Sequence, residues 1–160
     1  SILFQDNNLF PHLNIAENVG LGLSGGLRLT AQEKGAVQQV LSDVGLGDLA
    51  QRKPAALSGG QQSRAALARV LLAGRPVVLL DEPFAALGPR LKDEMLDLVR
   101  ERLVPQGRTI LMVSHDPSDV KRIADQVCLV ADGRVSEPVP TDILFANPPT
   151  ALRDYLGEMG

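Results

Sequence analysis

From residue 57 onward, short apolar segments alternate with longer segments that have a helical pattern, and this alternation constrains the fold most. Runs of Val, Leu and Ile predict strands, whereas apolar positions spaced three and four apart predict helices. The expected strands cover residues 76–80, 109–113 and 126–131, and the expected helices cover residues 59–73, 89–103 and 117–124. Strands that alternate with helices pair in parallel. The sequence therefore predicts an α/β fold in which helices flank a parallel sheet, with functional residues at the carboxyl ends of its strands.

Residues 1–56 follow a different pattern. The first apolar residues are expected to end a strand at Gln5, and a mostly helical stretch follows. Thr30 and Glu33 have the spacing of a capping box, which predicts a helix over residues 31–44. This part of the chain is thus expected to be a helical insertion rather than a continuation of the strand–helix alternation.

Composition limits the class of protein. With 160 residues, of which 44% are hydrophobic and 3% aromatic, the chain can build one sizeable core from aliphatic side chains. The net charge of −3 offers no basic excess for a phosphate backbone, so no nucleic-acid partner is expected. The single cysteine, Cys128, lies in an apolar stretch and is expected to be a buried small hydrophobe. No apolar run approaches the roughly 20 residues that a membrane-spanning helix needs.

Two adjacent carboxylates, Asp81 and Glu82, follow the expected strand at residues 76–80. Carboxylates at the end of an apolar strand need a cation, a donor or water, and a nucleotide with bound Mg²⁺ would supply a cation. In that interpretation Asp81 takes part in Mg²⁺ coordination, and Glu82 accepts a hydrogen bond or a proton from the attacking water. The alternative is a polar strand exit that opens a turn at Pro83.

The segment Leu-Ser-Gly-Gly-Gln at residues 57–61 precedes an expected helix. Ser58 is a natural N-cap, and Gly59 and Gly60 allow backbone amides to approach an anion closely at the positive end of the helix. A plain helix cap would also explain Ser58 and Gly59. It would not explain Gln61, so the full segment favours a phosphate-binding turn.

His115 follows an expected strand and precedes an expected helix. A histidine in this place can donate a hydrogen bond to a γ-phosphate, although a lone histidine more often has an ordinary surface or core role. Gln5 also stands at a strand end, where its amide could bind Mg²⁺ or a water, or simply be solvated. We expect the side chains of Gln5, Asp81, Glu82 and His115 to lie around one cleft for a triphosphate and its metal.

The sequence contains no G-x-x-x-x-G-K-[ST] phosphate loop, whose amides and lysine hold the phosphates of a nucleotide. The chain is therefore expected to be most of an ATPase that lacks its N-terminal part, and to be inactive alone. Loss of that part is expected to expose a sheet edge and apolar surface, which would favour a docking or dimerisation module as the alternative function.

Together these segments resemble the ATP-binding subunits of ATP-binding cassette transporters, and the resemblance covers nearly the whole chain. The matching segments are Gln5 for the Q-loop glutamine, residues 57–61 for the signature, residues 77–82 for the Walker B strand and His115 for the switch histidine. The resemblance implies a P-loop NTPase-like sheet with an added helical subdomain. It divides the chain into a strand end at residues 1–5, a helical subdomain at 6–56, a RecA-like core remainder at 57–136 and a C-terminal helical tail at 137–160.

The resemblance also implies an ATP hydrolase that uses ATP and Mg²⁺ within a head-to-tail dimer. The residues that would contact the γ-phosphate of ATP held by the second ATP-binding subunit are Ser58, Gly59, Gly60 and Gln61. Those that would act on the ATP of their own subunit are the catalytic Glu82 and His115 and the metal-binding Asp81 and Gln5. In addition, Gln5 would link the state of the nucleotide to a partner surface.

The implied partners are transmembrane permease subunits, a second ATP-binding subunit in a homodimer and, indirectly, a periplasmic solute-binding protein. The implied location is the cytoplasmic face of the bacterial inner membrane. Residues 4–13, 18–23 and 112–115 are most similar to the thiamine importers of the family, which implies thiamine as the solute. Importers of iron, polyamines or sulfate are the alternative. Gly88 departs from the family's usual aspartate: the helix after it is expected to form, but the dimer contact of that aspartate is in question.

Overall fold

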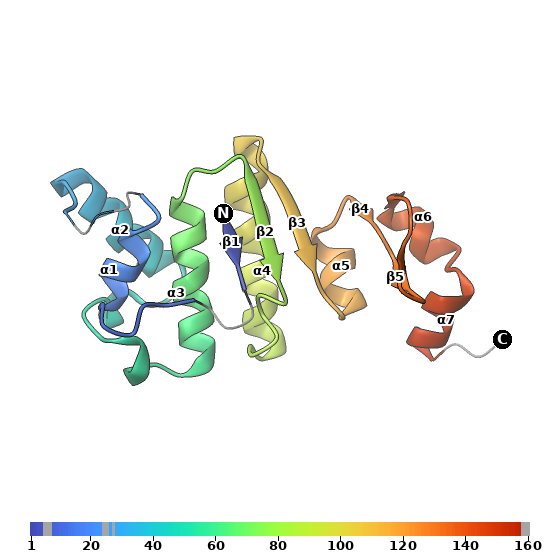
Figure 1. Cartoon of the computed structure of the whole chain (residues 1–160), viewed down its shortest axis with the longest axis horizontal. Helices are drawn as coiled ribbons and strands as arrows, with labels where there is room; N and C mark the ends of the chain where they lie inside the picture. Colours follow the sequence, from blue (N-terminus) through green and yellow to red (C-terminus); the bar gives the residue numbers. More distant parts are fainter. Residues whose placement is uncertain (5–7, 24–25, 27, 158–160) are drawn as a thin grey trace. The chain divides into compact units, whose positions relative to one another are not determined.

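The computed structural model describes residues 1–4, 8–23, 26 and 28–157, in two compact units, residues 1–115 and 116–160 (Figure 1). The elements of the first unit are β1 (Ile2–Leu3), α1 (Ile15–Gly20), α2 (Ala31–Asp43), two 3₁₀ turns (Gly47–Leu49 and Pro54–Ala56), α3 (Gly59–Leu72), β2 (Val77–Asp81), α4 (Pro89–Leu103), a third 3₁₀ turn (Val104–Gln106) and β3 (Thr109–Val113). Those of the second unit are α5 (Pro117–Ile123), β4 (Gln126–Val127), β5 (Val130–Ala131), β6 (Arg134–Val135), β7 (Val139–Pro140), α6 (Thr141–Ala146) and α7 (Thr150–Leu156).

Strands β1, β2 and β3 form a parallel sheet in this order, which confirms the predicted α/β architecture (Figure 1). The register pairs Leu3 with Leu80 and Leu80 with Met112. One face of the sheet is buried, because Leu3, Val78 and Leu80 are at most 1% exposed. The carboxyl ends of β2 and β3 lie side by side, so residues that follow these strands meet at the same edge.

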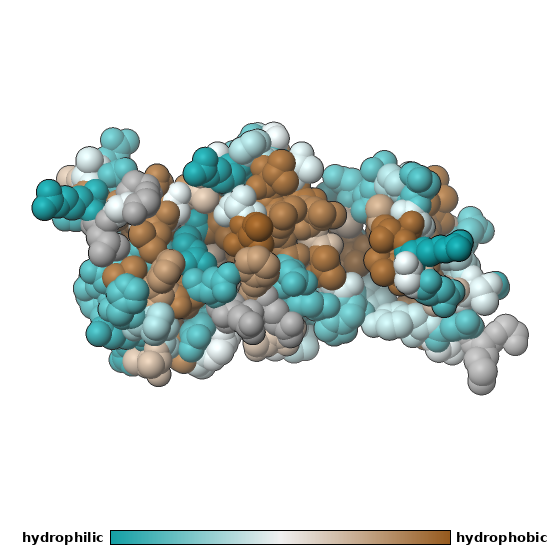
Figure 2. Space-filling view, viewed as in Figure 1, coloured by the Kyte–Doolittle hydropathy of each residue, from teal (hydrophilic) through white to brown (hydrophobic). Residues whose placement is uncertain are grey.

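The opposite face of this sheet is open to solvent and apolar. We call it the apolar sheet face; its side chains are 45% to 62% exposed and belong to Ile2, Phe4, Val77, Leu111 and Val113. Figure 2 shows apolar surface gathered over β2 and β3. Parallel sheets are usually buried on both faces, so this exposure is unusual for such strands.

Helix α4 forms over the residues that the sequence predicts, although Gly88 at its N-cap makes no side-chain capping bond. Pro89 occupies the first helical position, where its missing N–H costs nothing. One side of the helix buries Met95, Val99 and other apolar residues. The expected survival of this helix is thus confirmed.

Helices α1 and α2 lie in the part of the first unit that precedes α3, between β1 and the turn at residues 58–61. The predicted capping box of α2 is present: the Thr30 hydroxyl accepts from the Glu33 N–H at 3.2 Å, and Glu33 Oε2 accepts from the Thr30 N–H at 2.8 Å. Asn18 of α1 is fully buried, and its side chain binds the backbone of the preceding loop, including the Phe10 N–H at 2.7 Å and the Leu13 carbonyl at 3.2 Å. No described helix is both long and apolar enough to cross a membrane.

The second unit corrects one expectation. The strand expected over residues 126–131 is split: β4 pairs with β7, whereas β5 pairs with β6 across a turn at Asp132 and Gly133. Both turn residues have positive φ angles, of 50° and 71°, as in tight two-residue hairpins. Cys128 falls between the two short strands and is exposed, so its expected burial is wrong. The cause is pairing: the two halves of the segment have different partners, and no sheet continues through Cys128.

Candidate functional site

The site begins where β2 and β3 end. The register pairs Asp81 with Val113, and the Glu82 N–H donates to the Val113 carbonyl at 3.1 Å. This bond extends the pairing by one step beyond β2. It brings Glu82 beside the residues that follow β3, which are Ser114 and His115.

Glu82 and His115 are in direct contact. His115 Nδ1 lies 2.7 Å from Glu82 Oε1, across 33 positions of sequence. The carboxylate side chain is only 21% exposed, whereas the imidazole is 70% exposed. The histidine therefore holds a sheltered carboxylate in one orientation and still faces solvent. Such a pair can receive a proton at Glu82 and donate a hydrogen bond from the imidazole.

The backbone of Glu82 is left-handed, with φ of 45°. Non-glycine residues in this region cost about 1–3 kcal/mol and persist where the surroundings hold them. Two backbone bonds do so here: the Glu82 N–H donates to Val113, and the Glu82 carbonyl accepts from the Ala85 N–H at 3.4 Å. The sequence gives no sign of this conformation, because glutamate has no preference for it.

The two glycines of the turn at residues 58–61 have different surroundings. A Cβ on Gly60 would lie 3.0 Å from Leu87 Cδ2, so this glycine lets the turn pack against the loop that follows β2. A Cβ on Gly59 would meet nothing within 4 Å, so the front of the turn is open. An anion could approach the start of α3 from that side.

Ser58 caps α3 as the sequence predicts, and Gln61 completes a capping box. Ser58 Oγ accepts from the Gln61 N–H at 3.3 Å, and Gln61 Oε1 accepts from the Ser58 N–H at 2.9 Å. The oxygen of the Gln61 side chain is thus engaged within the turn. Any ligand contact of Gln61 would come from its amide nitrogen or would require this cap to open.

Three of the four residues expected around the cleft lie within the described part of the chain. Glu82 and His115 touch, and Asp81 is exposed at the end of β2, next to Glu82 in the chain. The Asp81 carboxylate is of the oxygen-donor type that Mg²⁺ prefers, so this residue fits the expected metal. Gln5 lies outside the described residues, and its predicted place in the site has no structural counterpart here.

Comparisons with known proteins show the family of this chain. The family model described as "ABC transporter" matches residues 1–85. Proteins named "Thiamine import ATP-binding protein ThiQ" from Ruegeria sp. strain TM1040 and from Cereibacter sphaeroides are each 60% identical over 157 residues. These alignments cover 98% of this chain and 68% of each relative.

A solved structure has a similar fold. It is the dimeric structure of an ATP-binding cassette in a post-hydrolysis state, bound to ADP and Pi, with a TM-score of 0.78 and 30% identity. The match covers 88% of this chain and 62% of that one. The chain therefore has the α/β fold of an ATP-binding cassette.

Proposed function

The chain belongs to the ABC transporter family, and from this premise we propose that it is the ATP-binding subunit of a bacterial thiamine importer. Its reaction is that of an ABC ATPase, the hydrolysis of ATP. The observation that carries the choice of thiamine is the 60% identity to two proteins named for thiamine import. A related importer of iron, polyamines or sulfate remains the alternative.

Glu82 is the proposed general base of the reaction. Its carboxylate is sheltered and is held by His115 at 2.7 Å, which fits a group that orients an attacking water and accepts its proton. His115 contacts Glu82 through Nδ1, and with both ring nitrogens protonated it would also donate from Nε2 to the γ-phosphate. Asp81 and Gln5 would hold Mg²⁺, which neutralises phosphate charge when bound.

Ser58, Gly59, Gly60 and Gln61 are proposed to contact the γ-phosphate of ATP held by a second ATP-binding subunit. The open front of Gly59 and the N-terminal end of α3 support this role. The further partners would be transmembrane permease subunits and, through them, a periplasmic solute-binding protein. The place of action would be the cytoplasmic face of the inner membrane.

The 160-residue chain alone is proposed to be inactive, because its sequence has no phosphate loop to hold the nucleotide. We expect no ATP turnover above background from this chain. A rate that disappears in Glu82→Gln, measured without any added partner, would refute this part of the proposal.

A chimera tests the proposed activity. The chain is joined to the part of the Ruegeria relative that it does not match, and ATP turnover and thiamine uptake are measured with that relative's permease. We expect turnover in the chimera, and ATP binding without turnover in its Glu82→Gln variant. The matched control is Glu101→Gln, an exposed position of α4 that is not among the proposed site residues.

Two outcomes would contradict different parts of the proposal, the role of Glu82 and the choice of solute. Unchanged turnover in the Glu82→Gln chimera would remove Glu82 from the role of base. Uptake of iron, a polyamine or sulfate in place of thiamine, with the matching permease, would transfer the chain to the alternative group of importers.

A second candidate function is a docking or dimerisation module. The apolar sheet face favours it, because apolar side chains exposed together on one face commonly mark an association surface. Its test is the oligomeric state of the chain, which does not depend on ATP.

A further inference from the structure

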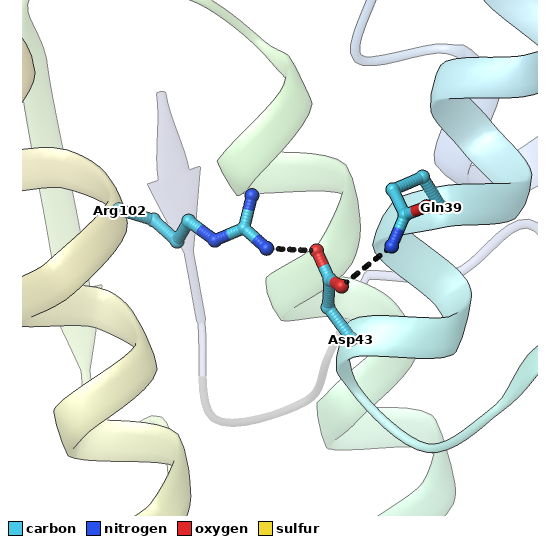
Figure 3. Close-up of polar contacts among 3 residues, drawn as sticks. All are labelled: Gln39, Asp43 and Arg102. Carbon is cyan, nitrogen blue, oxygen red and sulfur yellow. Dashed lines mark hydrogen bonds and ion pairs between the residues drawn. The ribbon is translucent and has the colours of Figure 1, made fainter.

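Two arginines from different helices converge on the C-terminal end of α2, at Asp43, Val44 and Gly45. Arg64 of α3 donates from Nη1 to the Val44 carbonyl at 2.8 Å and to the Gly45 carbonyl at 3.3 Å. Arg102 of α4 donates from Nη2 to Asp43 Oδ2 at 2.5 Å (Figure 3). We call the residues Asp43, Val44 and Gly45 the α2 end.

The α2 end is built to receive cations. The last carbonyls of a helix carry a partial negative charge, and Gly45 ends α2 in the left-handed conformation with φ of 67°. A Cβ at Gly45 would lie 3.0 Å from Arg64 Nη1, so glycine also leaves room for the arginine. Figure 3 shows that Asp43 faces Arg102 on one side and Gln39 on the other, and Gln39 Nε2 donates to Asp43 Oδ1 at 2.9 Å.

The two arginine contacts differ in exposure. Burial lowers the pKa of Arg64, while the charge of Glu94 acts in the opposite direction, which indicates that this guanidinium lies partly out of water. The Arg102 side chain is 49% exposed and that of Asp43 is 15% exposed. The Arg102 contact is therefore the weaker and the more sensitive to salt.

Helices α2, α3 and α4 form a closed ring of contacts. The turn at residues 58–61 packs against Leu87, in the loop between Glu82 and the start of α4. Arg64, in the first half of α3, and Arg102, near the C-terminal end of α4, both bind the α2 end. A shift of α4 relative to α2 would thus displace the first turn of α3.

We propose that Arg64 and Arg102 are positioning residues, which bind the α2 end and act as a clamp. The clamp holds the turn at residues 58–61 in a fixed place relative to the loop between Glu82 and the start of α4. Neither arginine is assigned a ligand contact. The importance of that turn rests on the proposed function, but the clamp itself is a property of the first unit and is testable without nucleotide.

The test measures amide hydrogen exchange at Gln61 and Gln62, in the first turn of α3, for the whole 160-residue chain. Loss of an exposed ion pair is worth a few tenths to about 1 kcal/mol, so we expect Arg102→Gln to speed their exchange about two- to fivefold. Asp43→Asn should act alike, and the double variant should be no faster than either single one. Added salt should speed exchange in the native chain but not in Arg102→Gln.

Arg90→Gln is the matched control. It removes the Arg90–Glu94 ion pair, which lies on the same helix at 3.0 Å with Arg90 94% exposed, and it leaves in place the charge of Glu94 that acts on Arg64. We expect this variant to leave exchange at Gln61 and Gln62 unchanged. Arg64→Lys should speed exchange more than Arg102→Gln does, and if Arg64→Lys does not fold, the Arg102 variants decide alone.

The proposal is overturned if Arg102→Gln leaves exchange at Gln61 and Gln62 unchanged, or if Arg90→Gln speeds it equally. Because no ATP is present in this experiment, its failure would leave the proposed function intact. Failure of the chimera in turn would leave the clamp intact.

Discussion

At the scale of single residues, Glu82 joins a sheltered carboxylate to a strained backbone. The strain is held by the Val113 carbonyl, while the side chain is held by His115. Both partners belong to the neighbouring strand or follow it directly. The position of the proposed base is therefore set by β3 as much as by the strand that carries it.

A glycine at position 82 is expected to relieve this strain. Glycine adopts positive φ at little cost, so Glu82→Gly should leave the free energy of unfolding unchanged or raise it by up to about 1 kcal/mol, despite losing the contact with His115. Asp81→Gly is the control, because Asp81 is the last residue of β2 and glycine there should lower the free energy of unfolding by roughly 0.5–1 kcal/mol. Urea unfolding compares the two, and equal losses would contradict the assignment of strain.

The candidate site was predictable where it depends on strand ends. Asp81, Glu82 and His115 follow apolar runs, and parallel pairing brings such ends together. The left-handed backbone of Glu82 was not predictable, because it depends on a bond to Val113, which is distant in sequence. The roles of these residues in catalysis stay predictions.

At the scale of elements, the start of α2 depends on a titrating side chain. Hydrogen bonds from the Thr30 backbone and side chain lower the pKa of Glu33 from 4.5. A lowered pKa means that the capping box stabilises the fold above the unfolded pKa, and that this stability is lost as the pH falls through the folded value. The loss belongs to acid conditions and not to neutral pH.

Glu33→Gln tests this dependence, because glutamine can keep the capping box without titrating. We expect the native chain to be at least as stable as the variant near neutral pH, and to lose stability relative to it on acidification. The measurement is the difference between their urea midpoints as a function of pH. A difference that does not change with pH would show that Glu33 makes no such contribution.

The packing of the segment after α1 against α3 depends on a glycine. A Cβ at Gly22 would collide with the carbonyl oxygen of Arg69 in α3. Because backbone atoms cannot yield as a flexible side chain does, Gly22→Ala should lower the free energy of unfolding by about 3 kcal/mol. The control is Gly35→Ala inside α2, where a Cβ meets nothing within 4 Å and alanine should add about 1 kcal/mol. Thermal or urea unfolding that fails to separate the two would contradict this close approach.

Elements with local signals were predicted to within one residue, and those that depend on distant partners were not. Pro89 starts α4, Gly107 with φ of 69° precedes β3, and both elements have the expected bounds. The expected strand at residues 126–131 is split because its halves pair with β7 and β6. No pattern within that segment indicates which partner each half takes.

At the scale of the whole molecule, each unit is held by its own pairing and core. The first unit has a parallel sheet with one buried face and one open face, and the second has two short antiparallel pairs. The predicted division into four segments is a functional one, and it stays a prediction. The open face matters for the behaviour of the chain in solution, since it carries five apolar side chains.

This apolar sheet face is expected to make the chain associate with itself. Leu111→Thr combined with Val113→Thr keeps residues that favour strands but makes the face more polar, so it should lower the mass found by light scattering at high concentration. The matched control is Val130→Thr with Val135→Thr, on the hairpin of the second unit, where the side chains are 70% and 68% exposed but lie on a single cross-strand pair. Equal effects from both pairs would mean that exposure of valine and leucine in general causes association. A native chain that stays monomeric would reject the docking or dimerisation alternative, and would leave the ATP-binding role as the one function that the sheet and its site support.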